Sequence, residues 1–226
     1  MNYNELLRLA LTSLKANKMR SLLTTLGVVI GVFAVILLVS LGSGLQKYIT
    51  NQISGLGSNL IFVIPGAIGG GRTPGGVQAN KLEMIDAKNV AMKLRSIAEV
   101  SPVIQKLTTI KYKNKTLKNT SILGSSANYP DIVKTDVVQG TFFTTSQERS
   151  GAKVALIGQT VKDTFFPNLN PIGQKITVSG TRYTVIGVIE KKGALFGLDQ
   201  DNTLLIPITA SQRQFGIKNL NTIYIS

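Results

Sequence analysis

Few residues in this chain are of a type that does bond chemistry, and the closest acid pair is Asp199 and Asp201, in the segment GLDQDN. Two nearby carboxylates can act as a general acid and base, or as oxygen ligands for a cation. A calcium loop needs further oxygen ligands at regular spacing and a closing Glu, and this segment lacks them. The alternate spacing instead predicts a turn in which the Asp side chains accept hydrogen bonds from nearby backbone amides.

Cysteine and histidine are both absent from the chain. Their absence excludes disulfides, thiolate and imidazole metal sites, Ser-His-Asp triads and Cys-His dyads. No residue is therefore nominated as catalytic. We expect a protein that is not an enzyme and that binds no metal or cofactor through its own side chains.

Glycines crowd residues 66–79, a composition that invites a phosphate-binding interpretation. A P-loop requires the string G-x-x-x-x-G-K-[ST], which does not occur in the sequence. A dinucleotide fingerprint would need a following helix and a downstream acid within a βαβ unit. The stretch is therefore predicted to be a flexible loop.

The net charge is +14, from 25 basic and 11 acidic residues. The densest basic run, at 111–118, alternates like the exposed face of a strand or hairpin and carries a single aromatic residue, Tyr112. Nucleic-acid binding usually adds stacking aromatic side chains to such charge, so we expect no nucleic-acid partner. Anionic lipid headgroups or cell-wall polymers are better candidates for these cations.

One segment is long and apolar enough to cross a membrane, namely residues 22–41, LLTTLGVVIGVFAVILLVSL, without a charged residue. Twenty helical residues span roughly 30 Å, the thickness of the hydrocarbon core. Four basic residues precede the segment and only Lys47 follows it closely. The positive-inside rule then places the N-terminus in the cytoplasm. A cleaved signal peptide would have a shorter apolar core, so a retained anchor is favoured.

These elements divide the chain into three parts: a cytoplasmic amphipathic helix at 1–20, a transmembrane helix at 21–42 and an extracytoplasmic domain at 43–226. The first part suits either the headgroup layer or the surface of a protein partner. Within the span, Gly27 and Gly31 form a G-x-x-x-G pair, which lets a second helix approach closely. We therefore predict a helix-packing face at Gly27 and Gly31.

Beyond the span, the pattern predicts an α+β domain of short strands and a few helices. Helices are expected as a stalk at 43–54, from Asn80 with Glu83 in a capping box, at 159–166 before Pro167, and from Thr209 to Gly216 with Gln212 completing a second capping box. Strands are expected at 59–64, within 100–123 where Pro102 indicates an edge or bulge, at 154–158, at 174–178 and 182–190 around the Ser179-Gly180 turn, at 203–208 and at 221–226. The last strand stops without a cap or polar tail, which suggests a domain truncated at its C-terminus.

Four blocks of sequence, in this order, resemble the permease subunit of MacB-type (FtsX-like) ABC transporters. They are SLKANKMRSLLTTLGVVIGVFAVI at 13–36, LGSNLIFVIPG at 56–66, VALIGQTVKDTFFPNLNPIGQKITVSGTRYTVIGVIEKKG at 154–193 and DQDNTLLIPITASQRQFG at 199–216. The resemblance covers nearly the whole chain.

The resemblance implies a four-helix permease of the inner or plasma membrane, with its extracytoplasmic core domain between the first two helices. It also implies a homodimer or a pair of related permeases, a possible periplasmic adaptor, and a separate ABC ATPase subunit that binds the ATP. That complex would couple hydrolysis to extracytoplasmic motion and to efflux of a drug, peptide or lipoprotein. Two alternatives stay open: an FtsX-like regulator of a cell-wall hydrolase, and a single-span sensor or adhesion module.

Overall fold

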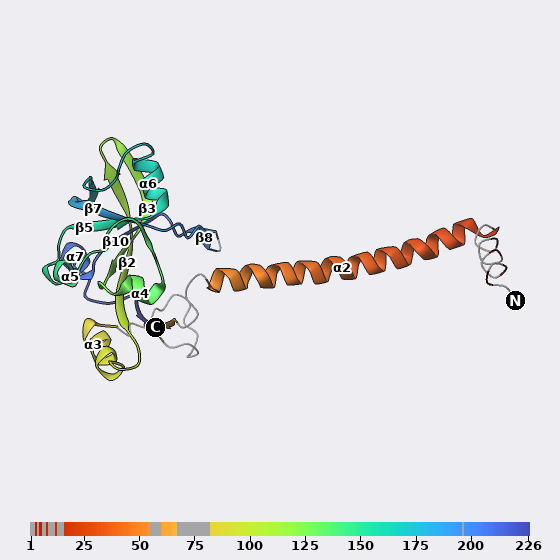
Figure 1. Cartoon of the computed structure of the whole chain (residues 1–226), viewed down its shortest axis with the longest axis horizontal. Helices are drawn as coiled ribbons and strands as arrows, with labels where there is room; N and C mark the ends of the chain where they lie inside the picture. The colour runs from red at the N-terminus through yellow and green to blue at the C-terminus, as the bar shows by residue number, and fades with distance from the viewer. Residues whose placement is uncertain are drawn as a thin grey trace. The chain divides into compact units, whose positions relative to one another are not determined.

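The structure is a computed structural model that describes residues 3, 5, 8, 12, 16–54, 60–66, 82–195 and 197–226. The chain divides into two compact units, Met1–Gln52 and Ile53–Ser226, and each is described by itself (Figure 1). The amphipathic helix predicted before residue 18 falls mostly outside the described residues. The glycine-rich loop and the predicted cap at Asn80 also lie outside them.

The first unit is dominated by one uninterrupted helix, α2 (Lys18–Ser54), which continues through the predicted stalk. Its apolar side chains are exposed around the whole circumference, and the segment is long and apolar enough to cross a membrane. Inside a bilayer, polar groups must be satisfied within the protein. The Thr25 hydroxyl accordingly donates to the Ser21 carbonyl at 2.7 Å, and the Ser43 hydroxyl to the Val39 carbonyl at 2.8 Å.

The second unit is built around a ring of six strands. In spatial order, each hydrogen-bonded to the next, the strands are β2 (Val100–Tyr112), β3 (Lys115–Ser125), β10 (Thr203–Pro207), β5 (Val154–Ile157), β7 (Thr181–Ile189) and β6 (Lys175–Val178), which returns to β2. The β3–β10 and β5–β7 pairs are parallel, and the other four are antiparallel. The ring is thus a small closed barrel, and closure satisfies both edges of its strands.

The barrel interior is filled by alternate side chains of these strands, including Ile110, Ile176 and Tyr183. Helix α6 (Gln159–Phe165) adds Val161 and Phe165 to the same cluster. A tight turn at Ser179 and Gly180 joins β6 to β7, with φ of 44° and 86°. Positive φ at both positions matches the right-handed twist of a two-residue hairpin, as the sequence predicts.

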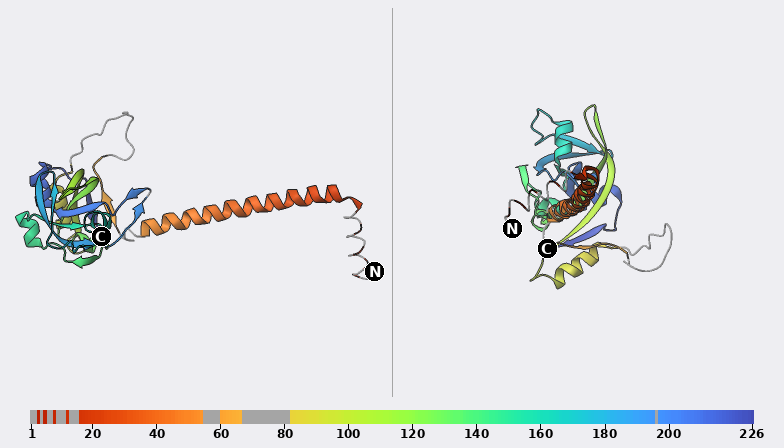
Figure 2. Two further views of the ribbon diagram at one scale, coloured as in Figure 1. Left: turned by 90° about the horizontal axis from the view of Figure 1, so that it is seen from above. Right: turned by 90° about the vertical axis from the view of Figure 1, so that its right-hand side faces the viewer.

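Two further apolar clusters cover the outside of the barrel. The first packs α4 (Tyr129–Val133) and the edge strand β4 (Val137–Gly140) against β5 and β10, and α5 (Thr145–Ser150) lies beside it. The second joins α3 (Met84–Lys93), β1 (Ile61–Val63), β11 (Thr222–Ile225) and α7 (Ile208–Phe215). Helices α3 and α6 lie at opposite ends of this unit, as the views of Figures 1 and 2 agree. A separate hairpin, β8 (Ala194–Leu195) and β9 (Leu198–Asp199), completes the elements.

The α+β class is confirmed, with one apolar N-terminal helix followed by a mixed α/β domain, and most predicted elements are found within a residue or two. Helix α3 begins at Met84, and the carboxylate of Asp86 accepts a hydrogen bond from the Glu83 backbone N–H at 2.8 Å, so the capping box lies three residues later than predicted. The capping box predicted for Thr209 and Gln212 is wrong. Helix α7 already includes Thr209, whose hydroxyl donates to the Glu148 carbonyl instead.

Pro102 lies within the thirteen-residue strand β2, where it pairs with Ile223 of β11. The pairing of β2 with β3 starts two residues later, at Ile104. Pro102 is therefore at a position paired on one side only. That arrangement tolerates a residue without a backbone N–H, in agreement with the predicted edge character.

Candidate functional site

The acid pair at Asp199 and Asp201 is a structural turn, as its spacing predicts. One oxygen of Asp199 accepts hydrogen bonds from the backbone N–H of Asp201 at 2.8 Å and of Asn202 at 3.2 Å, and the other accepts from the Thr160 hydroxyl at 2.8 Å. Because these carboxylate oxygens are engaged in fixing the turn, the pair offers no arrangement for acid–base catalysis.

Asp201 is buried and connects the turn to the segment after β7. Its two carboxylate oxygens accept from the backbone N–H of Lys192 at 2.8 Å and of Gly193 at 3.0 Å. Gly158, between β5 and α6, also packs closely on this turn, since a Cβ added at Gly158 would lie 2.2 Å from the Asp201 carbonyl oxygen. The base of the β8–β9 hairpin is therefore held by a compact polar joint.

The predicted helix-packing pair, Gly27 and Gly31, lies on exposed surface of α2. A Cβ added at either glycine would meet no atom within 4 Å other than its own helix backbone and neighbours. The pair is thus free to receive another helix backbone in the way that small residues permit. The packing role itself stays a prediction.

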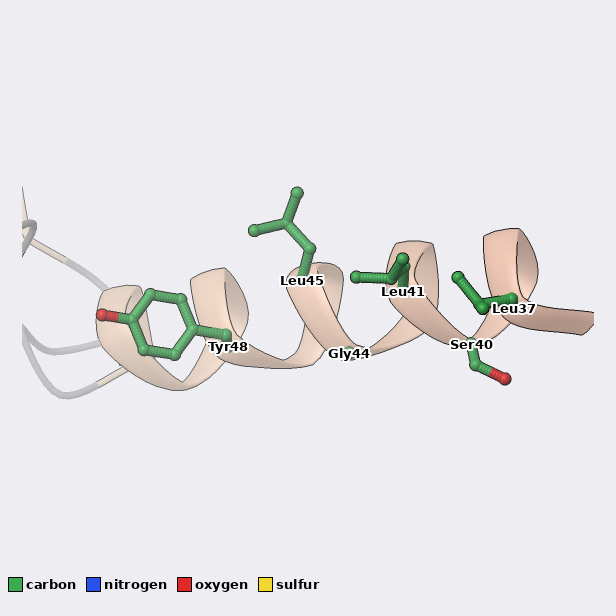
Figure 3. A pocket seen from close by; sticks show the side chains of 6 residues that line it. All are labelled: Leu37, Ser40, Leu41, Gly44, Leu45 and Tyr48. Carbon is green, nitrogen blue, oxygen red and sulfur yellow. The ribbon is translucent and has the colours of Figure 1, made fainter. Parts of the chain in front are cut away.

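A second open face lies further along α2, where a shallow groove is lined by Leu37, Ser40, Leu41, Gly44, Leu45 and Tyr48 (Figure 3). Gly44 leaves a gap one turn after Ser40 and one turn before Tyr48, so this is also a small-x-x-x-small pattern. Unlike the hydroxyls of Thr25 and Ser43, the Ser40 hydroxyl has no hydrogen-bond partner in the described part of the chain. In a bilayer it would be satisfied either by the Ile36 carbonyl one turn earlier, as Ser43 is by Val39, or by a polar group on a neighbouring helix.

The two faces point in different directions. At 100° of rotation per residue, the Ser40–Gly44 pair is turned roughly 140° from the Gly27–Gly31 pair around the helix axis. One neighbouring helix cannot cover both pairs along a straight contact line. The arrangement suits a helix with two different neighbours. Sequence reasoning missed the second face, although Ser40-x-x-x-Gly44 is visible in the sequence.

An exposed apolar helix joined to a mixed α/β domain with a barrel core defines a membrane-anchored protein with a separate folded domain. The particular family follows from comparison with known proteins. The family model described as the MacB-like periplasmic core domain matches residues 21–226. The chain belongs to this family.

Relatives named as exporters are similar over almost all of the chain. The macrolide export ATP-binding/permease protein MacB of Marinobacter nauticus is 34% identical over 100% of this chain and 35% of its own length. The pyoverdine export ATP-binding/permease protein PvdT of Pseudomonas fluorescens is 35% identical over 93% of this chain and 31% of its own length. The chain thus spans about a third of the length of these relatives.

Two solved structures share the fold of the second unit. The periplasmic region of MacB from Actinobacillus actinomycetemcomitans superposes with a TM-score of 0.64 at 22% identity, covering 77% of each chain. The extracellular domain of the noncanonic ABC-type transporter YknZ from Gram-positive bacteria gives a TM-score of 0.59 at 20% identity, over 74% of this chain and 83% of its own. At such identities the likeness concerns the fold.

Proposed function

We propose that this chain is part of the permease of an ABC-type exporter or mechanotransmission complex. The observation that carries the proposal is the family match over residues 21–226, joined to a helix of membrane-spanning length. Relatives named as macrolide and pyoverdine exporters support an efflux role. The residues of this chain would transmit movement and do no bond chemistry.

The proposal fixes a membrane topology: α2 crosses the inner or plasma membrane, with residues 1–20 in the cytoplasm and residues after about 42 outside. Because the chain has no cysteine, a single introduced thiol reports its own location without background. In intact spheroplasts, a membrane-impermeant maleimide should label Lys218→Cys and leave Met19→Cys unlabelled until the membrane is permeabilised. Equal labelling of both thiols before permeabilisation would contradict this topology.

ATP hydrolysis would come from a separate ABC ATPase subunit, and the permease would work as a homodimer or with a related permease, with a periplasmic adaptor as a further partner. The relatives' printed names combine ATP binding and permease in one protein, so the separate subunit is a distinct part of the proposal. The purified permease alone should show no ATPase activity. Robust hydrolysis without an added partner would contradict it.

The cargo proposed is a drug, peptide or lipoprotein, and a macrolide is the first to test because several relatives are named for macrolide export. Inverted membrane vesicles that contain the permease and its ATPase should accumulate a labelled macrolide when ATP is added. Vesicles without the permease are the control. If ATP drives a conformational movement of the permease but no macrolide, peptide or lipoprotein accumulates, the result would favour a regulatory transducer instead.

The open faces of α2 are proposed as contacts with other membrane helices. Gly44→Ile fills the gap beside Ser40 and should weaken association in detergent by about tenfold, because the helix backbones can no longer approach closely. Val39→Ile, at a position between the two faces, adds bulk away from either pair and is the matched control. Size-exclusion chromatography with light scattering measures the assembly. If Gly44→Ile and Val39→Ile assemble to the same extent, this face does not pack against another helix.

A further inference from the structure

One part of the barrel surface is strongly basic and carries no acid. The strands β2, β3, β6 and β7 contain no Asp or Glu at all. Their basic residues are Lys106, Lys111, Lys115, Lys118, Lys175 and Arg182. Some of these already have structural contacts, since Lys115 donates to the Thr164 carbonyl at 2.7 Å and Lys106 lies over the ring of Phe215.

Three of the cations share one face, which the strand register determines. Lys111 of β2 pairs with Thr177 of β6, and Thr177 pairs with Arg182 of β7. Lys175 lies two residues before Thr177 on the same strand and so projects to the same side. The intervening residues, such as Ile176, point into the barrel and are buried. Lys111, Lys175 and Arg182, here called the cationic row, therefore face outward.

The cationic row is electrostatically uncompensated. Within the described residues, all three side chains are exposed and make no ion pair or hydrogen bond. Neighbouring strands are about 4.8 Å apart, so Lys111 and Arg182, separated by β6, are about 10 Å apart at the backbone. That separation is slightly more than the Debye length of about 8 Å at physiological salt, so water and ions largely screen the charges from one another. All three cations therefore remain available to an anionic partner.

We propose that the cationic row docks the acidic surface of a partner protein. The face is on the outside of the closed barrel, whereas small-ligand sites are concave. Thr177 lies between Lys111 and Arg182, and Thr116 lies on the other side of Lys111; both supply hydroxyl donors. Membrane-surface binding usually adds apolar side chains that insert between lipids, and the residues between these cations are polar. Carboxylates match the donors, because Arg182 can bind one in a bidentate manner.

The inference rests on the surface of the second unit alone, so it stands or fails independently of the exporter proposal. Oppositely charged surfaces of this kind chiefly set association rates and partner choice, and their effect weakens at high salt. A partner bound here should therefore dissociate more readily as ionic strength rises.

The test uses the full chain in a non-ionic detergent and a fluorescein-labelled polyglutamate peptide of about twenty residues. We expect salt-sensitive binding that weakens on the order of tenfold in the triple variant Lys111→Gln, Lys175→Gln, Arg182→Gln. The matched control, Lys88→Gln, Lys93→Gln, Lys218→Gln, removes the same charge from exposed positions elsewhere and should bind nearly as well as the parent. Circular dichroism checks that the folds are equal, and Lys111→Gln alone replaces the triple variant if that variant unfolds.

Equal loss of binding in both triple variants would overturn the proposal, because net charge and not this face would then explain the affinity. A second arm uses vesicles containing phosphatidylglycerol, added to the chain in nanodiscs of neutral lipid. Binding to these vesicles that depends on the cationic row, without binding of polyglutamate, would also overturn it and assign the face to lipid.

Discussion

Removing the buried Asp201 carboxylate should lower the free energy of unfolding of the second unit more than removing an exposed carboxylate would. Asp201 is only 3% exposed and accepts hydrogen bonds from the backbone N–H of Lys192 at 2.8 Å and of Gly193 at 3.0 Å. In Asp201→Ala both N–H groups lose an ionised acceptor. Each hydrogen bond to a charged group contributes about 1.5–3 kcal/mol, and water reaching Lys192 recovers part of it. We expect a loss of about 3 kcal/mol.

The free energy of unfolding is measured on the full chain in detergent by urea titration, followed by the near-ultraviolet circular dichroism of its tyrosines. For a unit of this size, about 3 kcal/mol corresponds to a fall in Tm of roughly 6–12 °C. Asp199→Ala is the matched control, because Asp199 accepts similar hydrogen bonds but is exposed, so that water can replace it. Its expected cost is about 1 kcal/mol. Equal losses in the two variants would refute the argument from burial.

Two further predictions concern the barrel. Gly158→Ala should lower the unfolding free energy by about 2–3 kcal/mol in the same titration, because its Cβ would lie 2.2 Å from the Asp201 carbonyl oxygen. An unchanged midpoint would show that the backbone at Gly158 shifts without cost. Burial raises the pKa of Tyr183 to about 12, whereas an unfolded tyrosine titrates near pH 10. Stability should therefore be complete below pH 10 and fall by up to about 3 kcal/mol towards pH 12. Tyr183→Phe should lack that part of the fall, and an identical pH profile would contradict the assignment.

Local patterns predicted most of the single elements. The Ser179-Gly180 turn, the strand before Gly158 and the helix ending before Pro167 depend on neighbouring residues, and all three are found. The capping box of α5 was visible in the same way, because Thr144 and Gln147 have the right spacing. It was overlooked.

Closure of the barrel was beyond such reasoning. It requires β6 to pair with β2, whose residues lie more than sixty positions earlier, and no local periodicity encodes a pairing of that range. Tertiary contacts also overrode the cap predicted at Thr209, because its hydroxyl finds a better partner in the Glu148 carbonyl. On α2, the Gly27–Gly31 pair is recognisable as a sequence motif. The Ser40 hydroxyl, which has no partner among the described residues, is recognised only in the structure, by comparison with the hydrogen-bonded hydroxyls of Thr25 and Ser43.

The pairing of β1 with β11 sets the order in which the second unit can fold. Ile61 pairs with Ile225, so β1 is synthesised long before the strand with which it pairs. At about 5–20 residues per second, the interval between them is on the order of ten to thirty seconds. During that time Phe62 and its neighbours have no sheet to join, and a chaperone or the translocation machinery would have to shield them. The topology thus delays the pairing of β1 until β11 has been made.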